Sequence, residues 1–220
     1  MYAGSEGDVL VDFAVEANVE SVGELGRIDV GASVAHGDCG PSREKHTVRE
    51  CDVLRRDTRD AGVDDMRAMC GYFDSTLLAL QALIPAMADT PGGGQIVVFT
   101  SDAGARPEAG WSVYGAVRAG QNFLVQAVAL EHASTGVCVN AIGSKNAVFA
   151  GFPGTPRHAV SDDAIELGEW AAAQLAETPL PRLGTMEELA AFAAVLLDGR
   201  NRFQTAQVFS FSGGWNARGR

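Results

Sequence analysis

The sequence has few of the residues that build metal sites or disulfide frameworks. Its four cysteines and four histidines are scattered along 220 residues, and no C-x-x-C pair occurs. This spacing excludes the common structural zinc sites. Cys138 lies in an apolar run typical of a strand, where a buried free thiol is favoured over a disulfide. We therefore expect a cytoplasmic protein without a bound metal.

Positive charge is also scarce. Seventeen Lys and Arg residues stand against 28 Asp and Glu residues, which gives a net charge of -11 and an isoelectric point near 4.7. Such a surface repels polyphosphates and anionic lipids, so nucleic acid and membrane surfaces are excluded as partners. No window reaches the roughly 18 apolar residues that a membrane span needs, and the start of the chain has no basic segment. We expect an unexported protein that acts on a small molecule.

The chain has no internal repeat and no low-complexity tract. With 46% hydrophobic residues it can bury a sizeable core, and its length fits one ordinary domain over residues 1–220.

Segments of helical and strand-like periodicity alternate along the chain. The predicted helices span residues 64–87, 112–134, 161–177 and 185–198, and the predicted strands span 28–35, 95–100, 137–142 and 206–212. Residues 8–23 combine a short strand at their start with helical spacing, residues 36–61 read as a solvated segment, and 143–160 as an irregular loop. The alternation predicts an α/β fold with a Rossmann-like, doubly wound parallel sheet.

Three polar residues after the strand 95–100 have a spacing that could bring them together in one site. Ser101 stands at its carboxyl end, where open α/β sheets place their ligand crevice. Tyr114 and Arg118 are four residues apart on the next predicted helix and so share one face. A nearby guanidinium favours the phenolate, which makes this set a candidate for acid/base catalysis. The alternative is that all three are ordinary surface and packing residues.

Short motifs spread over most of the chain resemble successive hallmarks of the short-chain dehydrogenase/reductase superfamily. They are GRIDV (26–30), QALIPAM (81–87), GGGQIVVFTS (92–101), YGAVRAG (114–120), VCVNAIG (137–143), PLPRLGTMEELA (179–190) and VFSFSGGW (208–215). The resemblance implies catalytic roles for Ser101 and Tyr114. It also implies a Lys four residues past the Tyr that binds the nicotinamide ribose, and here that position is Arg118.

The departures from the superfamily pattern fall on the cofactor site. From the resemblance we expect the chain to begin beyond the first βα units, which carry the glycine-rich pyrophosphate turn in this superfamily. GGG at 92–94 precedes a strand rather than opening a helix. SVAHG at 33–37 and GSKNAVF at 143–149 replace two further cofactor-binding turns, and the helix 64–87 contains no Asn. We therefore expect no cofactor, and no binding of NAD(P).

A Ser, Tyr and Arg set without a cofactor site is similar to that of the halohydrin dehalogenases. The resemblance implies that Ser101 and Tyr114 bind the substrate hydroxyl and that Arg118 lowers the pKa of the Tyr. The alkoxide then displaces a neighbouring halide and closes an epoxide. It further implies halide binding near residues 143–149, with Asn146, Ala147 and Phe149 as candidates. The alternative for Phe149 is packing within a lid.

Two other functions remain open at this point. The same trio could serve a cyclase, isomerase or dehydratase, or the chain could be a non-catalytic paralogue. The superfamily resemblance also implies a homodimer or homotetramer through the helices 64–87 and 112–134. The strand 28–35 would form an exposed edge, which we expect residues 8–14, a partner chain or the segment 36–61 to cover.

Overall fold

The computed structural model describes residues 8–11, 58–147, 172 and 175–217. Within these ranges the main elements are β1 (Asp8–Val11), α2 (Val63–Ala88), β2 (Gln95–Ser101), α3 (Ser112–His132), β3 (Cys138–Ser144), α5 (Met186–Leu197) and β4 (Val208–Phe211). Three short 3-10 helices accompany them: η1 (Asp102–Gly104), η2 (Ala133–Thr135) and η4 (Trp215–Ala217). The helices and strands predicted within the described ranges are present, with ends that differ by at most two residues.

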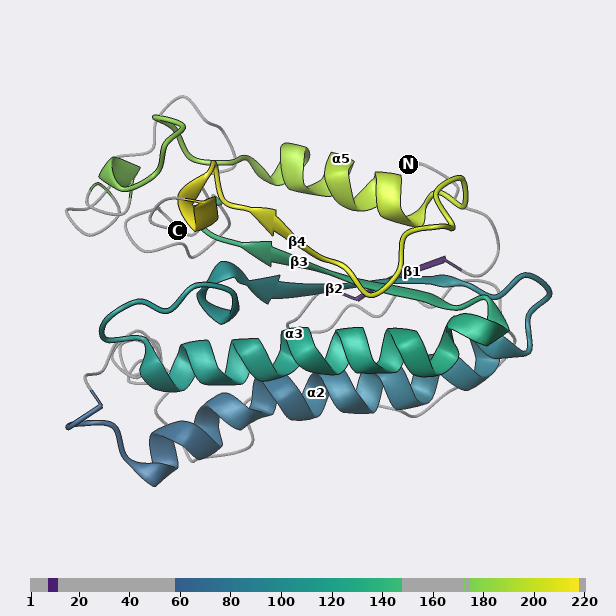
Figure 1. The fold of residues 1–220 in the computed structure, drawn as a ribbon, viewed down its shortest axis with the longest axis horizontal. Helices are drawn as coiled ribbons and strands as arrows, with labels where there is room; N and C mark the ends of the chain where they lie inside the picture. Colours follow the sequence, from purple (N-terminus) through teal and green to yellow (C-terminus); the bar gives the residue numbers. More distant parts are fainter. Residues whose placement is uncertain (1–7, 12–57, 148–171, 173–174, 218–220) are drawn as a thin grey trace, which may run out of the picture.

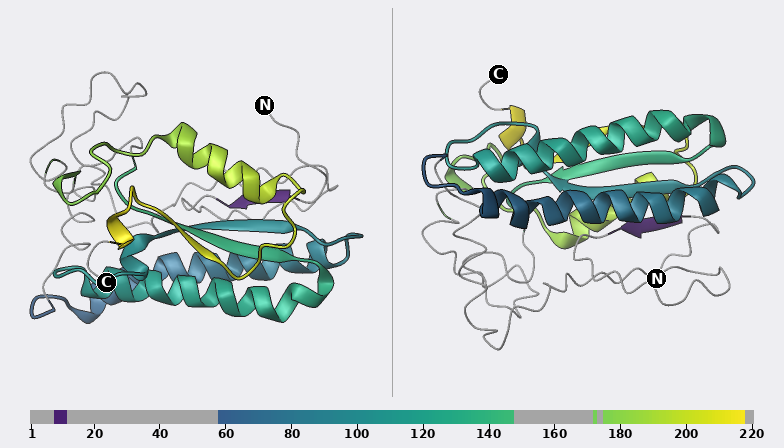
Figure 2. Two further views of the ribbon diagram at one scale, coloured as in Figure 1. Left: turned by 45° about the horizontal axis from the view of Figure 1, so that its top comes forward. Right: turned by 90° about the horizontal axis from the view of Figure 1, so that it is seen from below.

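The four strands form one parallel sheet in the order β1-β2-β3-β4. α2 and α3 pack side by side on one face of the sheet and α5 covers the other (Figures 1 and 2). This arrangement confirms the predicted Rossmann-like α/β fold. The predicted helix 161–177 and strand 28–35 lie largely or wholly outside the described residues.

Among the described strands, β1 lies at one end of the sheet. The strand that pairs with β2 on its outer side is β1, whose residue Asp8 lies opposite Gln95 and whose Val11 lies opposite Val98. The sequence assigns this segment only a short strand, and the predicted edge strand 28–35 lies outside the described residues. A run of four residues is too short to show a clear alternation, which is why β1 carries so weak a signal.

Two apolar layers hold the sheet between its helices. One core cluster lies between the sheet and the pair α2 and α3, and a smaller one lies between the sheet and α5. β2 and β3 are buried on both faces, as expected for the central strands of a covered parallel sheet. Their register places Ser101 opposite Ser144, so both strands end at the same level. Within the described ranges, no helix is long and apolar enough to cross a bilayer.

Candidate active site

Ser101 is the last residue of β2 and is largely buried, with 8% of its surface exposed. Its hydroxyl accepts a hydrogen bond of 3.2 Å from the backbone N–H of Ala103, and so caps η1. The side chain therefore sits at the carboxyl edge of the sheet, where the sequence predicts a ligand crevice.

A close backbone contact joins this edge to α3. A Cβ atom on Gly104 would lie only 2.5 Å from the carbonyl carbon of Arg118, so no larger residue fits without movement. The glycine lets η1 pack directly on the helix that carries Tyr114 and Arg118. All three predicted catalytic residues are consequently held at one end of the domain.

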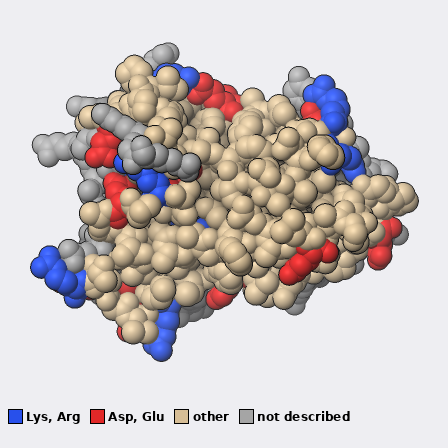
Figure 3. Space-filling model, in the orientation of Figure 1, with Lys and Arg blue, Asp and Glu red and all other residues tan. Residues whose placement is uncertain are grey.

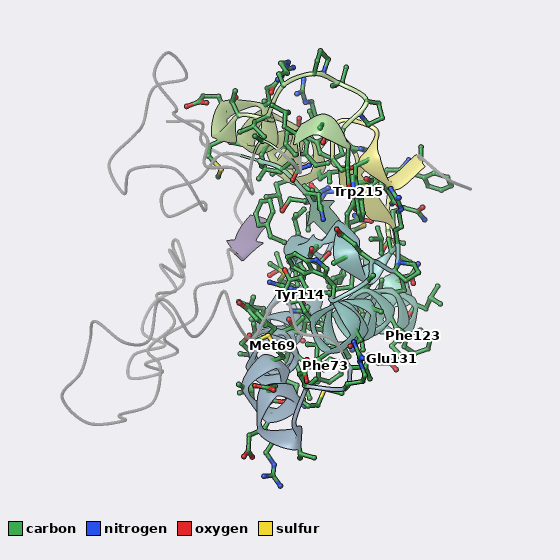
Figure 4. All side chains as sticks on the ribbon, turned by 90° about the vertical axis from the view of Figure 1, so that its left-hand side faces the viewer. Met69, Phe73, Tyr114, Phe123, Glu131 and Trp215 are labelled. Atoms are coloured by element: carbon green, nitrogen blue, oxygen red, sulfur yellow. The ribbon has the colours of Figure 1, made fainter. Side chains whose placement is uncertain are left out.

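Tyr114 lies in the first turn of α3 and is half-buried. Its ring makes edge contacts with two aromatic rings, that of Trp111 at a centroid distance of 5.4 Å and that of Tyr72 at 6.2 Å. Tyr72 comes from α2, so the phenol of Tyr114 lies where the two long helices meet (Figure 4). Edge contacts of this kind fix the plane of an aromatic ring.

Arg118 follows one helical turn later and is 8% exposed. Its guanidinium carbon lies 3.9 Å from the ring centroid of Tyr72 and 5.0 Å from that of Tyr114. Its Nη1 donates a hydrogen bond of 2.9 Å to Oε1 of Gln121. The predicted juxtaposition of Tyr114 and Arg118 is thus present, but the cation faces aromatic rings.

Gln121 connects this cation to the helix opposite. Its amide nitrogen donates hydrogen bonds of 2.7 Å to the backbone oxygen of Tyr72 and to the hydroxyl of Thr76. Gln121 and Thr76 are both fully buried. A buried polar network of this kind specifies one arrangement of its members. The sequence does not indicate the roles of Gln121 and Tyr72, because their contact joins α3 to α2 across 49 residues of the chain.

The predicted halide-binding residues lie after β3. Asn146 adopts a left-handed backbone conformation with φ of 58°, and its amide nitrogen donates a hydrogen bond of 2.7 Å to the hydroxyl of Thr178. Ala147 is buried and pairs with Gly184. Phe149 lies outside the described residues. A cavity of about 110 Å³ is lined in part by Asn146 and Thr178.

Lys145 is a residue of this region that the sequence analysis does not single out. Its ammonium lies 2.6 Å from a carboxylate oxygen of Glu108, and 4.2 Å and 5.1 Å from the ring centroids of Trp215 and Trp111. Trp111 in turn contacts Tyr114. The available signal was a lysine that directly follows a buried strand, next to the site.

Asp102 follows Ser101 directly, but no sequence pattern indicates a role for it in the site. It is 1% exposed, and one of its carboxylate oxygens accepts a hydrogen bond from the hydroxyl of Ser210. Burial raises the pKa of this carboxyl, while the hydroxyls of Ser210 and Ser212 and the charge of Lys145 oppose the shift. Among the residues that the structure describes, no cluster of three or more His, Cys, Asp or Glu could hold a metal ion.

Comparison with known proteins shows the family of the chain. The family described as enoyl-(acyl carrier protein) reductase matches residues 6–216 of the sequence. The chain belongs to the short-chain dehydrogenase/reductase superfamily. A curated relative, the oxidoreductase asL5 of Sarocladium schorii, is 31% identical over 193 residues, which are 87% of this chain and 67% of the relative.

Solved structures of the superfamily share the fold. A protein described as a dehalogenation enzyme has a TM-score of 0.64 and 28% identity, and the match covers 74% of this chain and 64% of the other. A short-chain type dehydrogenase/reductase from Mycobacterium ulcerans has a TM-score of 0.64 and 25% identity, with coverage of 74% and 56%. The chain spans between 45% and 67% of the length of the first two curated relatives it matches.

Members of this superfamily are expected to use a nicotinamide cofactor, with the ribose held by the Lys that Arg118 replaces. In this short-chain dehydrogenase/reductase homologue the guanidinium of Arg118 is buried, bonded to Gln121 and packed on the Tyr72 ring. The described residues at this position therefore do not fit a nicotinamide ribose.

Proposed function

We propose that the chain is a cofactor-independent acid/base enzyme of the halohydrin dehalogenase type, which converts vicinal haloalcohols to epoxides. The observation that carries the proposal is the cation beside Tyr114. The guanidinium of Arg118 lies 5.0 Å from the centroid of that ring and is fixed by Gln121. Arginine stays charged at every physiological pH, so its charge stabilises the negative charge that develops on the tyrosine oxygen.

In the proposed reaction, Ser101 orients the substrate hydroxyl by a hydrogen bond and Tyr114 takes its proton. The resulting alkoxide oxygen attacks the neighbouring carbon, and the carbon–halogen bond breaks with both electrons leaving on the halide. The products are an epoxide, a halide ion and one proton, which Tyr114 returns to water. The loop that contains Asn146 and Ala147 would bind the leaving halide, and Phe149 belongs to the same proposed site.

A relative supports this class of reaction. The solved structure with 28% identity and a TM-score of 0.64 is described as a dehalogenation enzyme. A charged Arg four residues after a catalytic Tyr suits such a reaction, because the cation stabilises a phenolate without relaying protons.

The second candidate is a conventional oxidoreductase. It is favoured by the names of the curated relatives, among them the oxidoreductase asL5 and an acetoacetyl-CoA reductase of Cupriavidus necator that is 29% identical over 180 residues. This reading would require a nicotinamide cofactor bound through residues other than Arg118.

One experiment separates the two candidates. Purified protein is incubated with 1-chloro-2-propanol or 1-bromo-2-propanol and halide release is followed between pH 6 and pH 10. We expect halide release without added cofactor, and none from the Tyr114→Phe variant. In a parallel arm, NADH or NADPH is added with a small ketone, and oxidation of the cofactor is followed by absorbance. Cofactor oxidation without halide release would replace the dehalogenase proposal with the oxidoreductase one.

A further inference from the structure

Lys145 is a largely buried cation that directly follows β3, at the end of the domain that carries the proposed active site. Only 9% of its side chain is exposed, and its ammonium lies 2.6 Å from a carboxylate oxygen of Glu108, of whose side chain 16% is exposed. A charge that loses contact with water is costly unless a close partner compensates for the lost hydration. Glu108 supplies that partner, so the two side chains hold one another in place.

Two tryptophan rings also contact this ammonium. Its nitrogen lies 4.2 Å from the ring centroid of Trp215 and 5.1 Å from that of Trp111. Both distances are within the range of a cation–π contact. Trp215 belongs to η4 and Trp111 stands directly before α3, and these segments lie at the same end of the domain (Figure 1). Lys145 therefore connects the C-terminal part of the described chain to the start of the helix that carries Tyr114.

The two rings depend on Lys145 to different degrees. Trp215 is 1% exposed and is also held by Arg106, whose guanidinium carbon lies 4.3 Å from the ring centroid and whose Nη1 donates a hydrogen bond to the backbone oxygen of Trp215. Trp111 is only half-buried. Loss of the Lys145 cation should therefore release Trp111 more than Trp215.

The ring of Trp111 lies against the proposed base. It meets the ring of Tyr114 edge-on, with centroids 5.4 Å apart and an angle of 61° between the planes. A general base must lie within roughly 2.6–3.2 Å of the atom that gives up the proton. A small movement of the Tyr114 ring would therefore slow proton transfer, and Trp111 opposes such a movement.

We propose that Lys145 is a positioning residue of the proposed active site, which holds Trp111 against Tyr114 through its ion pair with Glu108. The effect on turnover rests on the proposed function, whereas the effect on the position of the Tyr114 ring does not. Lys145 takes no proton and contacts no reacting atom. Its role differs from that of Arg118, whose charge stabilises the negative charge on the tyrosine oxygen.

The first test is an NMR measurement on the full chain with ¹³C-labelled tyrosine rings. The Tyr114 resonances are identified as those that Tyr114→Phe removes. We expect Lys145→Met, which removes the charge but keeps an unbranched side chain, to shift these resonances. Lys145→Arg keeps a cation beside Glu108 and should restore most of the wild-type positions.

The control is Arg200→Met, which breaks an exposed ion pair after α5. This pair lies at the opposite end of β2 from Ser101, because the neighbouring Gly199 donates a hydrogen bond to the side chain of Gln95, the first residue of the strand. We expect the Tyr114 resonances of this variant to match those of the wild type. An unchanged Tyr114 spectrum in Lys145→Met, or an equal shift in Arg200→Met, overturns the proposal.

A double-variant comparison tests whether Trp111 carries the effect. In a Trp111→Leu background, Lys145→Met should cause no further shift of the Tyr114 resonances, because the ring through which Lys145 acts is absent. Full additivity of the two substitutions overturns the proposal. If Lys145→Met fails to fold because Glu108 is left unpaired, Glu108→Gln combined with Lys145→Met removes both charges and takes its place in each comparison.

The rate of halide release measures the effect on turnover. For Lys145→Met with 1-bromo-2-propanol we expect kcat per folded molecule to fall roughly ten- to a hundredfold and KM to change by less than about threefold, because a misplaced base affects the transition state more than substrate binding. Lys145→Arg should recover most of kcat. Shifted Tyr114 resonances with an unchanged kcat overturn the role of Lys145 in the reaction. If the wild type releases no halide, the proposed function fails, while the NMR comparison still decides whether Lys145 positions Tyr114.

Discussion

The guanidinium carbon of Arg118 lies 3.9 Å from the centroid of the Tyr72 ring, closer than its 5.0 Å from that of Tyr114. The cation that the proposed mechanism needs is therefore held by α2 as much as by its own helix. Tyr72 and Gln121 fix where the positive charge sits, and mutations in them test the mechanism without touching the reacting groups.

Gln121→Ala should destabilise the fold and disturb the site. The change removes two hydrogen bonds to α2 and leaves Nη1 of the buried Arg118 guanidinium without the acceptor that Gln121 provides. We expect a loss of about 1–3 kcal/mol of unfolding free energy in urea. Gln126→Ala, an exposed glutamine of the same helix, is the matched control and should change stability by less than about 0.5 kcal/mol. Equal effects of the two variants would contradict the assigned role of the network.

Arg118→Lys should leave partial halide release, because lysine keeps the charge but loses the planar group that stacks on Tyr72. We expect the rate to fall by roughly ten- to a thousandfold. Steady-state kinetics with 1-bromo-2-propanol measures it, and a wild-type rate would show that the cation has no part in turnover.

Ser101→Ala should reduce the rate of halide release more than Arg118→Lys does and less than Tyr114→Phe does. It removes a hydrogen bond to the substrate oxygen but leaves the base in place. Ser134→Ala, which alters an exposed serine of η2, is the control. If Ser101→Ala and Ser134→Ala have the same rate, Ser101 does not contact the substrate.

The sequence predicts the strand and helix that carry this site better than it predicts the contacts between their side chains. The strand 95–100 and the helix 112–134 are long segments of clear periodicity, so the sequence predicts Ser101 at the end of the strand and Tyr114 and Arg118 on the helix, where the structure has them. The contacts around them depend on tertiary packing, which local patterns do not encode.

Two contacts show why local sequence patterns do not predict the surroundings of the site. Ser210 reaches Asp102 across 108 residues of sequence, and only the registers of β2, β3 and β4 bring them together. Lys145 reaches Trp215 because both follow neighbouring strands. The signal of β1 is weak for a different reason: Asp8 pairs with Gln95, which is 87 residues away, and the four residues of the strand show little pattern.

Gly104→Ala tests the contact that brings the end of β2 to α3. An added Cβ would lie 2.5 Å from a backbone carbon of Arg118, and backbone can yield only by moving η1 or the helix. We expect a destabilisation of about 1–3 kcal/mol. Gly71→Ala is the control, because nothing lies within 4 Å of its added Cβ on α2. That variant should be more stable than the wild type by about 0.5–1 kcal/mol. Chemical unfolding of both variants gives the comparison, and similar signs for the two would contradict the packing argument.

The outer side of α3 carries the apolar surface that we propose for self-association. Phe123 and Leu130 are 73% and 71% exposed, and the middle of the face drawn in Figure 3 shows few charged side chains. Figure 4 shows Phe123 on the side of α3 away from α2.

We expect light scattering to show a homodimer or homotetramer, and we expect Phe123→Glu to dissociate the interface formed by this surface. Phe203→Glu, which alters an exposed phenylalanine before β4, should leave the α3 interface intact. A wild-type monomer of 23.0 kDa would rule out the assembly.

The stability of the fold should depend on pH through Asp102. Burial raises the pKa of its carboxyl above the ordinary value of 3.8, so the native state keeps this proton to a higher pH than the unfolded state does. Between the two pKa values the native state binds more protons, and the contribution of Asp102 to the unfolding free energy therefore falls as pH rises through this window. Asp102→Asn cannot ionise and lacks this decline.

At pH 4 we expect the Asp102→Asn variant to be within about 1 kcal/mol of the wild type in unfolding free energy, because an amide can still pair with Ser210. As pH rises toward neutrality, the variant should gain stability relative to the wild type. Urea unfolding of both proteins from pH 4 to pH 8 measures the difference, and Asp74→Asn, which removes an exposed carboxyl of α2, is the matched control. A difference between Asp102→Asn and wild type that stays constant with pH would mean that the buried carboxyl does not change its protonation on unfolding.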